Sequence, residues 1–265
     1  WWGSGVGYHR WAMPGGPQPM THRERRALAC EIADRARHCR DDALAVGLYG
    51  SLARGDDGPY SDIEILCVLK TPDEDYTREW TAGPWKAEVN FVGAEALFAQ
   101  AATVDGEWPL THGAYVHTRP LHDPEQLFPR LRHTVLNQSG DAFAAAIRSL
   151  IVEDLYELIG KVRNARHLNE PDGLPVVAMH LALRGAFLIG LANRTPYTSG
   201  TRLFAESLRL PERPAGYDDL CRLVMAGTLG NPARVATLCE GFWSGVERWA
   251  AARSIVLDDP RLIPF

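Results

Sequence analysis

Two apolar runs on either side of a short polar loop set the first limit on the fold of this chain. The first run, residues 43–49, ends in Gly50-Ser51, and the second begins beside Asp62 and includes Glu64. Short apolar runs bounded by glycine, proline and serine predict strands. Residues i and i+2 of a strand point to the same side. We therefore expect both carboxylates side by side on one surface of a sheet.

Two neighbouring carboxylates repel each other unless a cation lies between them. Mg²⁺ takes hard oxygen ligands and is often held by one or two carboxylates together with substrate phosphates. Gly50-Ser51 offers backbone N–H groups and a hydroxyl to such a phosphate. Isolated Asp-x-Glu pairs are common, so the alternative is a strand whose outer face happens to be acidic. The complete pattern of Gly-Ser, ten residues and Asp-x-Glu favours a Mg²⁺ site with Asp62 and Glu64 as its ligands.

Composition narrows the class of protein. A net charge of −5 over 265 residues gives no basic footprint for nucleic acid and mildly favours cationic partners. The five cysteines are unclustered and odd in number, which argues against a disulfide framework or zinc site and predicts a reducing cytoplasm. No apolar run was found to reach the ~18 residues of a membrane helix, so we expect no membrane partner.

The helical and strand patterns divide the chain into three parts. Residues 1–20 are rich in glycine, proline and tryptophan and are interpreted as a leader or an expression-derived segment. Residues 21–139 mix helical and strand patterns, whereas residues 140–265 predict only helices with short connections. The expected fold class is α+β, with an N-terminal mixed sheet and a C-terminal up-and-down helical bundle.

The elements expected within these parts follow from local signals. Thr21 and Glu24 match a capping box and predict a helix to about Arg37. Beyond the two strands already described, the mixed part is expected to contain an acidic connector at 72–84, strands at 85–91 and 114–121, helices at 93–104 and 124–136, and a linker at 137–140. The bundle helices are expected at 141–166, 174–193, 201–208, 218–225 and 231–253.

Glu88 is a candidate third carboxylate. It alternates in phase with Lys86 and Asn90 on the polar side of the strand at 85–91. A carboxylate from a neighbouring strand often completes a metal site of this kind. The alternative is an ordinary solvated strand face.

A second polar constellation lies in the first bundle helix. Glu153, Glu157 and Lys161 are spaced i, i+4, i+8 and therefore share one stripe of the helix. A general base and a phosphate-binding cation could use this geometry. The alternative is a surface ladder of ion pairs, worth only about 0.3–0.5 kcal/mol per pair.

Taken together, these motifs resemble the kanamycin nucleotidyltransferases, which are the aminoglycoside 4′-O-nucleotidyltransferase family of the polymerase-beta-like nucleotidyltransferase superfamily. The resemblance covers nearly everything from Met20 onward and is densest in 46–91. The matching segments are Tyr49-Gly50-Ser51-Leu52, Asp57–Glu64, Trp85–Phe91, Trp108-Pro109-Leu110-Thr111-His112-Gly113, Leu150–Asn164 and Arg261–Phe265.

The resemblance implies a nucleotidyltransferase domain at 21–139, a helical domain at 140–265, and a homodimer whose active sites lie between subunits. It assigns roles to three groups of residues. Asp62 and Glu64 match the metal ligands, with Glu88 as an additional acidic residue. Ser51, Arg54 and Ser61 match the nucleotide-phosphate region. The long helix supplies a catalytic base, Glu157, and a triphosphate-binding lysine, Lys161. Glu79 of the connector and Glu153 and Asp154 of the helix match the drug-binding acidic cluster, and Glu88 joins them in an acidic cleft for the drug.

The activity implied is transfer of AMP from Mg-ATP, or from another nucleoside triphosphate, to the 4′-hydroxyl of kanamycin-type drugs. Pyrophosphate is released and the cell becomes resistant. Asp154 departs from the family's glutamate, which bears on the drug spectrum and not on the reaction. Two alternatives stay open. One is an enzyme of this fold with another hydroxyl acceptor, and the other is a catalytically silent binding or antitoxin-like module. Such a module would tolerate loss of the candidate metal ligands, base and lysine, all of which are present here.

Overall fold

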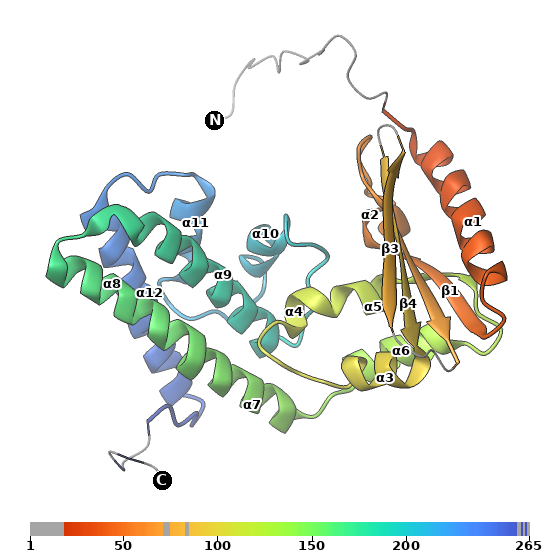
Figure 1. Ribbon diagram of the computed structural model, residues 1–265. Helices are drawn as coiled ribbons and strands as arrows, with labels where there is room; N and C mark the ends of the chain where they lie inside the picture. Colours follow the sequence, from red (N-terminus) through yellow and green to blue (C-terminus); the bar gives the residue numbers. More distant parts are fainter. Residues whose placement is uncertain (1–18, 71–74, 83–84, 259–260, 262, 264–265) are drawn as a thin grey trace.

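The computed structural model describes residues 19–70, 75–82, 85–258, 261 and 263. The expected leader up to residue 18, parts of the 72–84 connector and part of the last matching segment lie outside these residues. The described chain forms a five-stranded sheet flanked by helices, followed by a helical region (Figure 1). The expected α+β fold class is confirmed.

The sheet has the strand order β3-β4-β2-β1-β5. Its strands are β1 (Ala43–Tyr49), β2 (Ile63–Leu69), β3 (Tyr76–Ala82), β4 (Trp85–Gly93) and β5 (Arg119–His122). β2 and β4 run parallel, whereas the other neighbouring pairs are antiparallel, so the sheet is mixed.

Two sequence expectations for this domain are wrong. The acidic connector contains β3, an edge strand whose described side chains are mostly exposed, so it lacks the apolar alternation that marks a half-buried strand. The strand expected at 114–121 is instead a short helix, α5 (Gly113–His117), followed by β5. β5 is the opposite edge of the sheet, where Pro120 can be accommodated because an edge residue need not donate to a ladder.

Helices cover the two faces of the sheet unequally. Helix α1 (His22–His38) begins with the expected capping box and packs Ala29 and Ile32 against Ile63 and Ile65 of β2. The other face is covered only in part, by helices α3 (Ala94–Ala101), α5 and α6 (Leu127–Leu136), which lie beside one end of the strands (Figure 1). The uncovered part of that face, at the end of β1 and the start of β2, carries the candidate site.

The helical region is built on a long helix that the sequence predicted as one element at 141–166. It consists of α7 (Gly140–Ser149), a π-helical segment (Leu150–Leu155) and α8 (Tyr156–Leu168). In the π-helical segment the backbone N–H of Tyr156 donates to the carbonyl of Ile151, five residues earlier. The remaining helices are α9 (Leu174–Ala192), preceded by a 3₁₀ turn (Pro171–Gly173), α10 (Leu203–Ser207), α11 (Tyr217–Met225) and α12 (Pro232–Ala251).

Helix α9 corrects the expectation that no apolar run is long enough for a membrane span. Residues 171–192 are, within the described chain, the one helical segment with that length and composition. The segment is mostly buried, because α9 packs against α7, α8, α11 and α12. Its hydrophobicity therefore suits the central helix of the bundle.

The two parts of the chain share one hydrophobic core. This core begins at Leu66 and Val68 of the sheet and continues through α6 to Trp243 in α12. A backbone hydrogen bond of 2.5 Å from Tyr197 N to Pro109 O, and an ion pair between Arg202 and Asp56, also join them. The predicted boundary at 139/140 falls at Ser139, the N-cap of α7, but the division into two domains stays a prediction.

Candidate active site

Strand register places three carboxylates in a row across the sheet. Tyr49 on β1 lies opposite Glu64 on β2, Glu64 lies beside Glu88 on β4, and Glu88 lies opposite Glu79 on β3. Residues paired in this way share a face of the sheet. Asp62 precedes Glu64 by two residues and adds a fourth carboxylate at the start of β2. We call Glu64, Glu88 and Glu79 the carboxylate row.

Glu88 and Glu79 of this row make hydrogen bonds or ion pairs with neighbouring side chains. Tyr49 Oη donates to Glu88 Oε1 and accepts a hydrogen bond of 2.5 Å from Asn90 Nδ2. The ammonium of Lys86 lies 2.9 Å from Glu79 Oε1 and 3.5 Å from Glu88 Oε2. Lys86 thus provides one internal positive charge at the edge of the row.

Among the residues that the structure describes, Glu64 has no comparable partner, and its pKa reflects this. Burial, followed by the charges of Asp62 and Glu88, raises the pKa of Glu64 to about 7, and the positive charges of Arg54 and Lys86 only partly offset this. A carboxylate with so high a pKa is one that a nearby divalent cation would stabilise in its ionised form.

Gly50 makes room for this carboxylate. It begins the short helix α2 (Gly50–Arg54) with φ of 70°, a conformation that favours glycine. A Cβ atom at position 50 would lie 1.5 Å from Glu64 Oε2. The Gly-Ser motif therefore allows the end of β1 to approach the side chain that projects from β2.

The residues present fit a divalent cation of the Mg²⁺ type. Asp62, directly before β2, and Glu64, on β2, supply hard oxygen donors, which suit this class of ion. In the described part of the chain, no three His, Cys, Asp or Glu side chains are arranged to enclose a metal by themselves. A cation here would therefore take its remaining ligands from phosphate and water.

The predicted phosphate-binding residues lie on α2 and the loop that follows it. Ser51 is half-buried in the first turn of α2. Arg54 lies 3.3 Å from Asp56 through Nη2, and Ser61 Oγ accepts a hydrogen bond of 2.9 Å from Gly58 N. All three predicted residues thus belong to the segment that runs from the end of β1 to the start of β2.

The predicted base and lysine lie on α8. Glu157 Oε1 and Lys161 Nζ are 2.6 Å apart, and both side chains are more than half exposed. The hydrogen bond from Lys161 lowers the pKa of Glu157, so this carboxylate is ionised at neutral pH. The two residues line a groove of about 260 Å³ together with Asp154, Leu158, His180, Leu183 and Arg184.

The predicted drug-binding residues of the long helix differ in their surroundings. Asp154 Oδ2 lies 3.2 Å from Arg184 Nε, and the same guanidinium contacts Glu107 at 3.0 Å. Glu153 is exposed and is not among the residues that line the groove. Three of the predicted acidic residues, Glu79, Glu88 and Asp154, are therefore already paired with a cation of the same chain.

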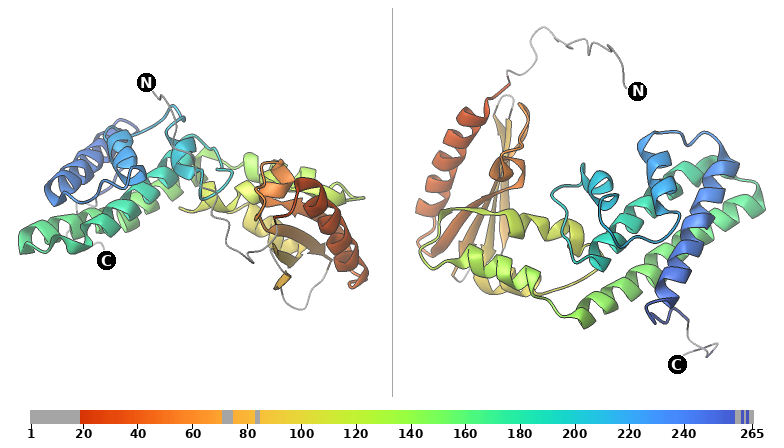
Figure 2. Two further views of the ribbon diagram at one scale, coloured as in Figure 1. Left: turned by 90° about the horizontal axis from the view of Figure 1, so that it is seen from above. Right: turned by 180° about the vertical axis from the view of Figure 1, so that it is seen from behind.

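Within one chain the sheet residues and the α8 residues are not brought together. Figure 1 and both views of Figure 2 show α8 at the opposite end of the molecule from the strands. The candidate metal ligands and the candidate base therefore do not face each other in the monomer.

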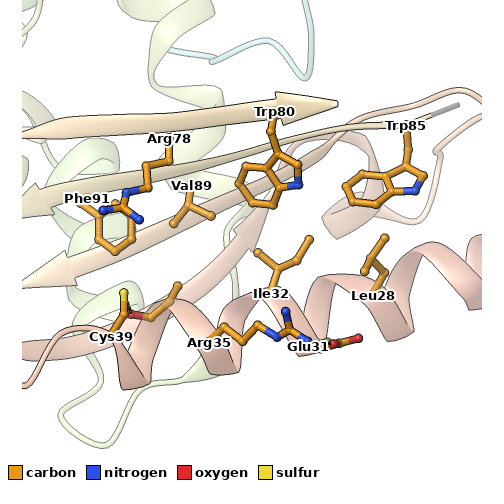
Figure 3. Close-up of a pocket in the computed structure, with 11 residues that line it drawn as sticks. Leu28, Glu31, Ile32, Arg35, Cys39, Arg78, Trp80, Trp85, Val89 and Phe91 are labelled. Carbon is orange, nitrogen blue, oxygen red and sulfur yellow. Dashed lines mark hydrogen bonds and ion pairs between the residues drawn. The ribbon is translucent and has the colours of Figure 1, made fainter. Parts of the chain in front are cut away.

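A separate groove occupies the opposite face of the sheet. Figure 3 shows Trp80 of β3 and Trp85 of β4 above Leu28 and Ile32 of α1, around a cavity of about 420 Å³. Because successive strand residues point to opposite faces, Glu79 belongs to the carboxylate row while Trp80 belongs to this groove.

Sequence reasoning did not single out Tyr49, Lys86 or Arg184 as site residues. The alternation of Lys86 with Glu88 and Asn90 was the one local signal available. Tyr49 reaches Glu88 across two strand pairings, and Arg184 reaches Asp154 from a different helix. Neither contact has a sequence pattern of its own.

Comparison with known proteins identifies the family of this chain. Residues 30–97 match a nucleotidyltransferase domain model and residues 125–256 match a KNTase C-terminal domain model. Two relatives named aminoglycoside nucleotidyltransferase (4′), from Staphylococcus aureus and a Bacillus species, are each 39% identical over 94% of this chain and 99% of theirs. The chain belongs to the aminoglycoside 4′-nucleotidyltransferase family. The resemblance stated from the motifs is confirmed, and the protein is an enzyme of the nucleotidyltransferase type.

A solved structure shares the fold of this family member at a greater distance. A nucleotidyltransferase-like protein from Exiguobacterium sibiricum aligns with a TM-score of 0.50 and 11% identity, covering 88% of this chain and 75% of that one. This likeness bears on the fold alone.

Proposed function

We propose that this enzyme acts in the cytoplasm, where it transfers AMP from Mg-ATP to the 4′-hydroxyl of kanamycin-type aminoglycosides and releases pyrophosphate. The modified drug no longer inhibits the cell, which is thereby resistant. The observation that carries the proposal is the Asp62/Glu64 pair beside Gly50-Ser51, in a chain 39% identical to aminoglycoside nucleotidyltransferases (4′) along nearly its whole length. ATP is the expected donor, although the same phosphate contacts suit other nucleoside triphosphates.

The nucleotide would be held by the loop between β1 and β2. Asp62 and Glu64 would hold Mg²⁺, with Glu88 close by in the carboxylate row. When bound, the ion neutralises phosphate charge and stabilises the charge that develops during transfer. Ser51, Arg54 and Ser61 would donate hydrogen bonds to the phosphates, and Lys161 would add a positive charge. These contacts fix the α-phosphorus for in-line attack.

Glu157 is proposed as the general base. Its carboxylate is ionised because of its pairing with Lys161, and the ionised form is the one that accepts a proton. When Lys161 binds phosphate, Glu157 loses that partner and is free to accept the proton of the attacking sugar hydroxyl. A positioned base typically contributes about 10²–10⁴-fold to the rate.

The acidic side chains would recognise the ammonium groups of the acceptor. Glu79 and Glu88 on the sheet and Glu153 and Asp154 on the helix offer negative charge from two directions. Lys86 and Arg184 now neutralise part of this charge, at 2.9 Å from Glu79 and 3.2 Å from Asp154. A polycationic drug would therefore compete with these cations for the same carboxylates.

The proposal includes a homodimer with active sites between subunits. The separation of α8 from the strands in one chain supports this assembly, because a second copy can bring its α8 to the sheet of the first. Each of the two sites would then use Asp62 and Glu64 of one subunit and Glu157 of the other.

Mixed dimers test the donor, the acceptor and the assembly together. Wild-type protein, Asp62→Asn and Glu157→Gln are each assayed with labelled ATP, Mg²⁺ and a panel of aminoglycosides and other hydroxyl compounds. Both variants should be nearly inactive alone. When they are co-expressed, half of the dimers are mixed and each mixed dimer has one intact site, so about a quarter of the wild-type activity should return.

The same assay separates the alternatives. If the wild type is active but co-expression of the two variants restores no activity, Asp62 and Glu157 act in a site within one subunit. Transfer only to non-aminoglycoside hydroxyls would change the acceptor. A wild type without any transfer would favour a catalytically silent module.

A further inference from the structure

A buried ion pair joins the start of α1 to the loop between β1 and β2, which contains the proposed phosphate-binding residues. Arg25 of α1 and Asp57 of the loop each have a side chain that is 1% exposed, and their Nη1 and Oδ2 atoms are 2.6 Å apart. His22, whose side chain is 48% exposed, lies 2.5 Å from Asp57 Oδ1 through Nδ1. The pair joins residues 32 positions apart in the sequence.

Arg25 holds the loop at two points. In addition to its contact with Asp57, its Nη2 donates to the carbonyl of Pro59 at 2.6 Å. The backbone N–H of Met20 donates to the same carbonyl at 3.1 Å. The start of α1 therefore binds both a side chain and the backbone of the segment between Gly55 and Asp62.

The fixed segment leads directly to the candidate metal ligand. After Pro59, a turn is closed by hydrogen bonds from Ser61 N to Gly58 O at 3.1 Å and from Gly58 N to Ser61 Oγ at 2.9 Å. Asp62 follows at once. A shift of Asp57 or Pro59 would therefore bear on Ser61 and Asp62, because the two hydrogen bonds of this turn join Gly58 to Ser61.

Burying such a pair is not required for stability. Two charges lose their hydration when they are buried, and apolar side chains of similar volume often stabilise a fold equally well. Arg25 adds what an apolar residue cannot, which is a planar set of donors that fixes a carboxylate and a carbonyl at defined angles.

We propose that Arg25 is a positioning residue for nucleotidyl transfer, acting through Asp57 and Pro59 to hold Ser61 and Asp62 in place for the Mg-nucleotide. This inference rests on the function proposed above. It assigns a role in the reaction to α1, a helix that contributes no side chain to the carboxylate row.

The test compares Arg25→Lys and Asp57→Asn with Arg35→Gln. Lysine keeps the charge at position 25 but not the two-point contact, and asparagine keeps the shape of Asp57. Arg35→Gln is the matched control, because Arg35 lies on the same helix and pairs with Glu31 on the exposed surface. Thermal unfolding of each variant is measured first. At a temperature well below every unfolding transition, we then measure kcat, KM for the acceptor, the Mg²⁺ concentration giving half-maximal rate, and calorimetric binding of Mg-ATP.

Arg25→Lys and Asp57→Asn should be folded, with kcat reduced about 10–100-fold, since a misplacement of roughly 1 Å can cost 10²-fold. Mg-ATP binding should weaken and more Mg²⁺ should be needed, while KM for the acceptor and all properties of Arg35→Gln stay near the wild type. Lower unfolding temperatures with unchanged kinetics and Mg-ATP binding would overturn the proposal, as would failure of both variants to fold.

The binding measurement separates this proposal from the proposed function. If the wild type transferred nothing to any acceptor, the proposed function would fail. Weaker Mg-ATP binding in Arg25→Lys would still support positioning of the loop, and unchanged binding would overturn it.

Discussion

Replacing Gly50 with alanine should separate the stability of the fold from the geometry of the site. Gly50 and Gly55 both have positive φ, 70° and 79°, at the two ends of α2. Alanine in this conformation costs about 1–2 kcal/mol. Each substitution should therefore lower the free energy of unfolding by that amount and the unfolding temperature by about 2–4 °C per kcal/mol.

The two substitutions differ in what the new methyl group meets. At Gly55 no atom lies within 4 Å of an added Cβ, whereas at Gly50 the Cβ would lie 1.5 Å from Glu64 Oε2 and 2.4 Å from Glu64 Cδ. Ordinary contact distances are about 3.5–4.0 Å, so the carboxylate must move by roughly 2 Å. It can do so by rotating the side chain, which displaces a candidate metal ligand.

Gly50→Ala should therefore lose at least about 10²-fold in kcat/KM, equivalent to about 2.7 kcal/mol of transition-state stabilisation. Gly55→Ala should remain within a few-fold of the wild type while showing a similar loss of stability. The assay is transfer from labelled ATP at several Mg²⁺ concentrations, with urea unfolding of both variants. Equal activity of the two variants would refute the reasoning, because it would mean that the position of Glu64 next to Gly50 does not matter for the reaction.

Two further outcomes follow from the charges described above. Glu157→Gln should lower kcat by about 10²–10⁴-fold with little change in ATP or drug binding. Lys161→Ala should raise KM for ATP as well as lower kcat. If steady-state kinetics showed that Glu157→Gln loses only drug affinity, Glu157 would belong to the drug-binding cluster. Burial disfavours ionisation of Asp57, but its hydrogen bonds with His22 and Arg25 outweigh this and lower its pKa below the ordinary 3.8. The stability that Asp57 contributes is therefore complete above about pH 4 and is lost as the pH falls through the lower, folded-state pKa. Urea unfolding between pH 6 and 3 should show a steeper acid loss for wild type than for Asp57→Asn, and parallel curves would contradict this.

Local patterns were sufficient for much of the fold. The capping box at Thr21, the apolar runs of β1 and β2 and the alternation of β4 each contain their own signal within a few residues. β3 was missed because an edge strand exposed on both faces has no apolar alternation, and α5 was missed because Tyr115 and Val116 suit a strand as well as one helical turn.

The candidate site was predictable only where its residues are close in sequence. Asp62 and Glu64 could be placed together because strand geometry fixes residues i and i+2. The Tyr49–Glu88 contact depends on the lateral register of three strands, and the Arg25–Asp57 pair depends on how α1 docks on the sheet. Such contacts follow from tertiary packing, which a single sequence does not specify.

The π-helical segment at Leu150–Leu155 has a consequence for how the long helix could be altered. A π-helical turn holds one more residue than an α-helical turn, so the segment absorbs an extra residue between α7 and α8 within a single turn. Deleting one residue there would convert the segment to regular α-helix and leave the direction of α8 relative to α7 nearly unchanged. Deleting one residue from the regular part of α7 would instead turn everything after it by about 100°. Glu157 and Lys161 would then point in a new direction while keeping their mutual spacing, and the apolar side of α8 would leave the bundle. The place of a deletion in the long helix thus decides whether these two polar side chains keep their direction.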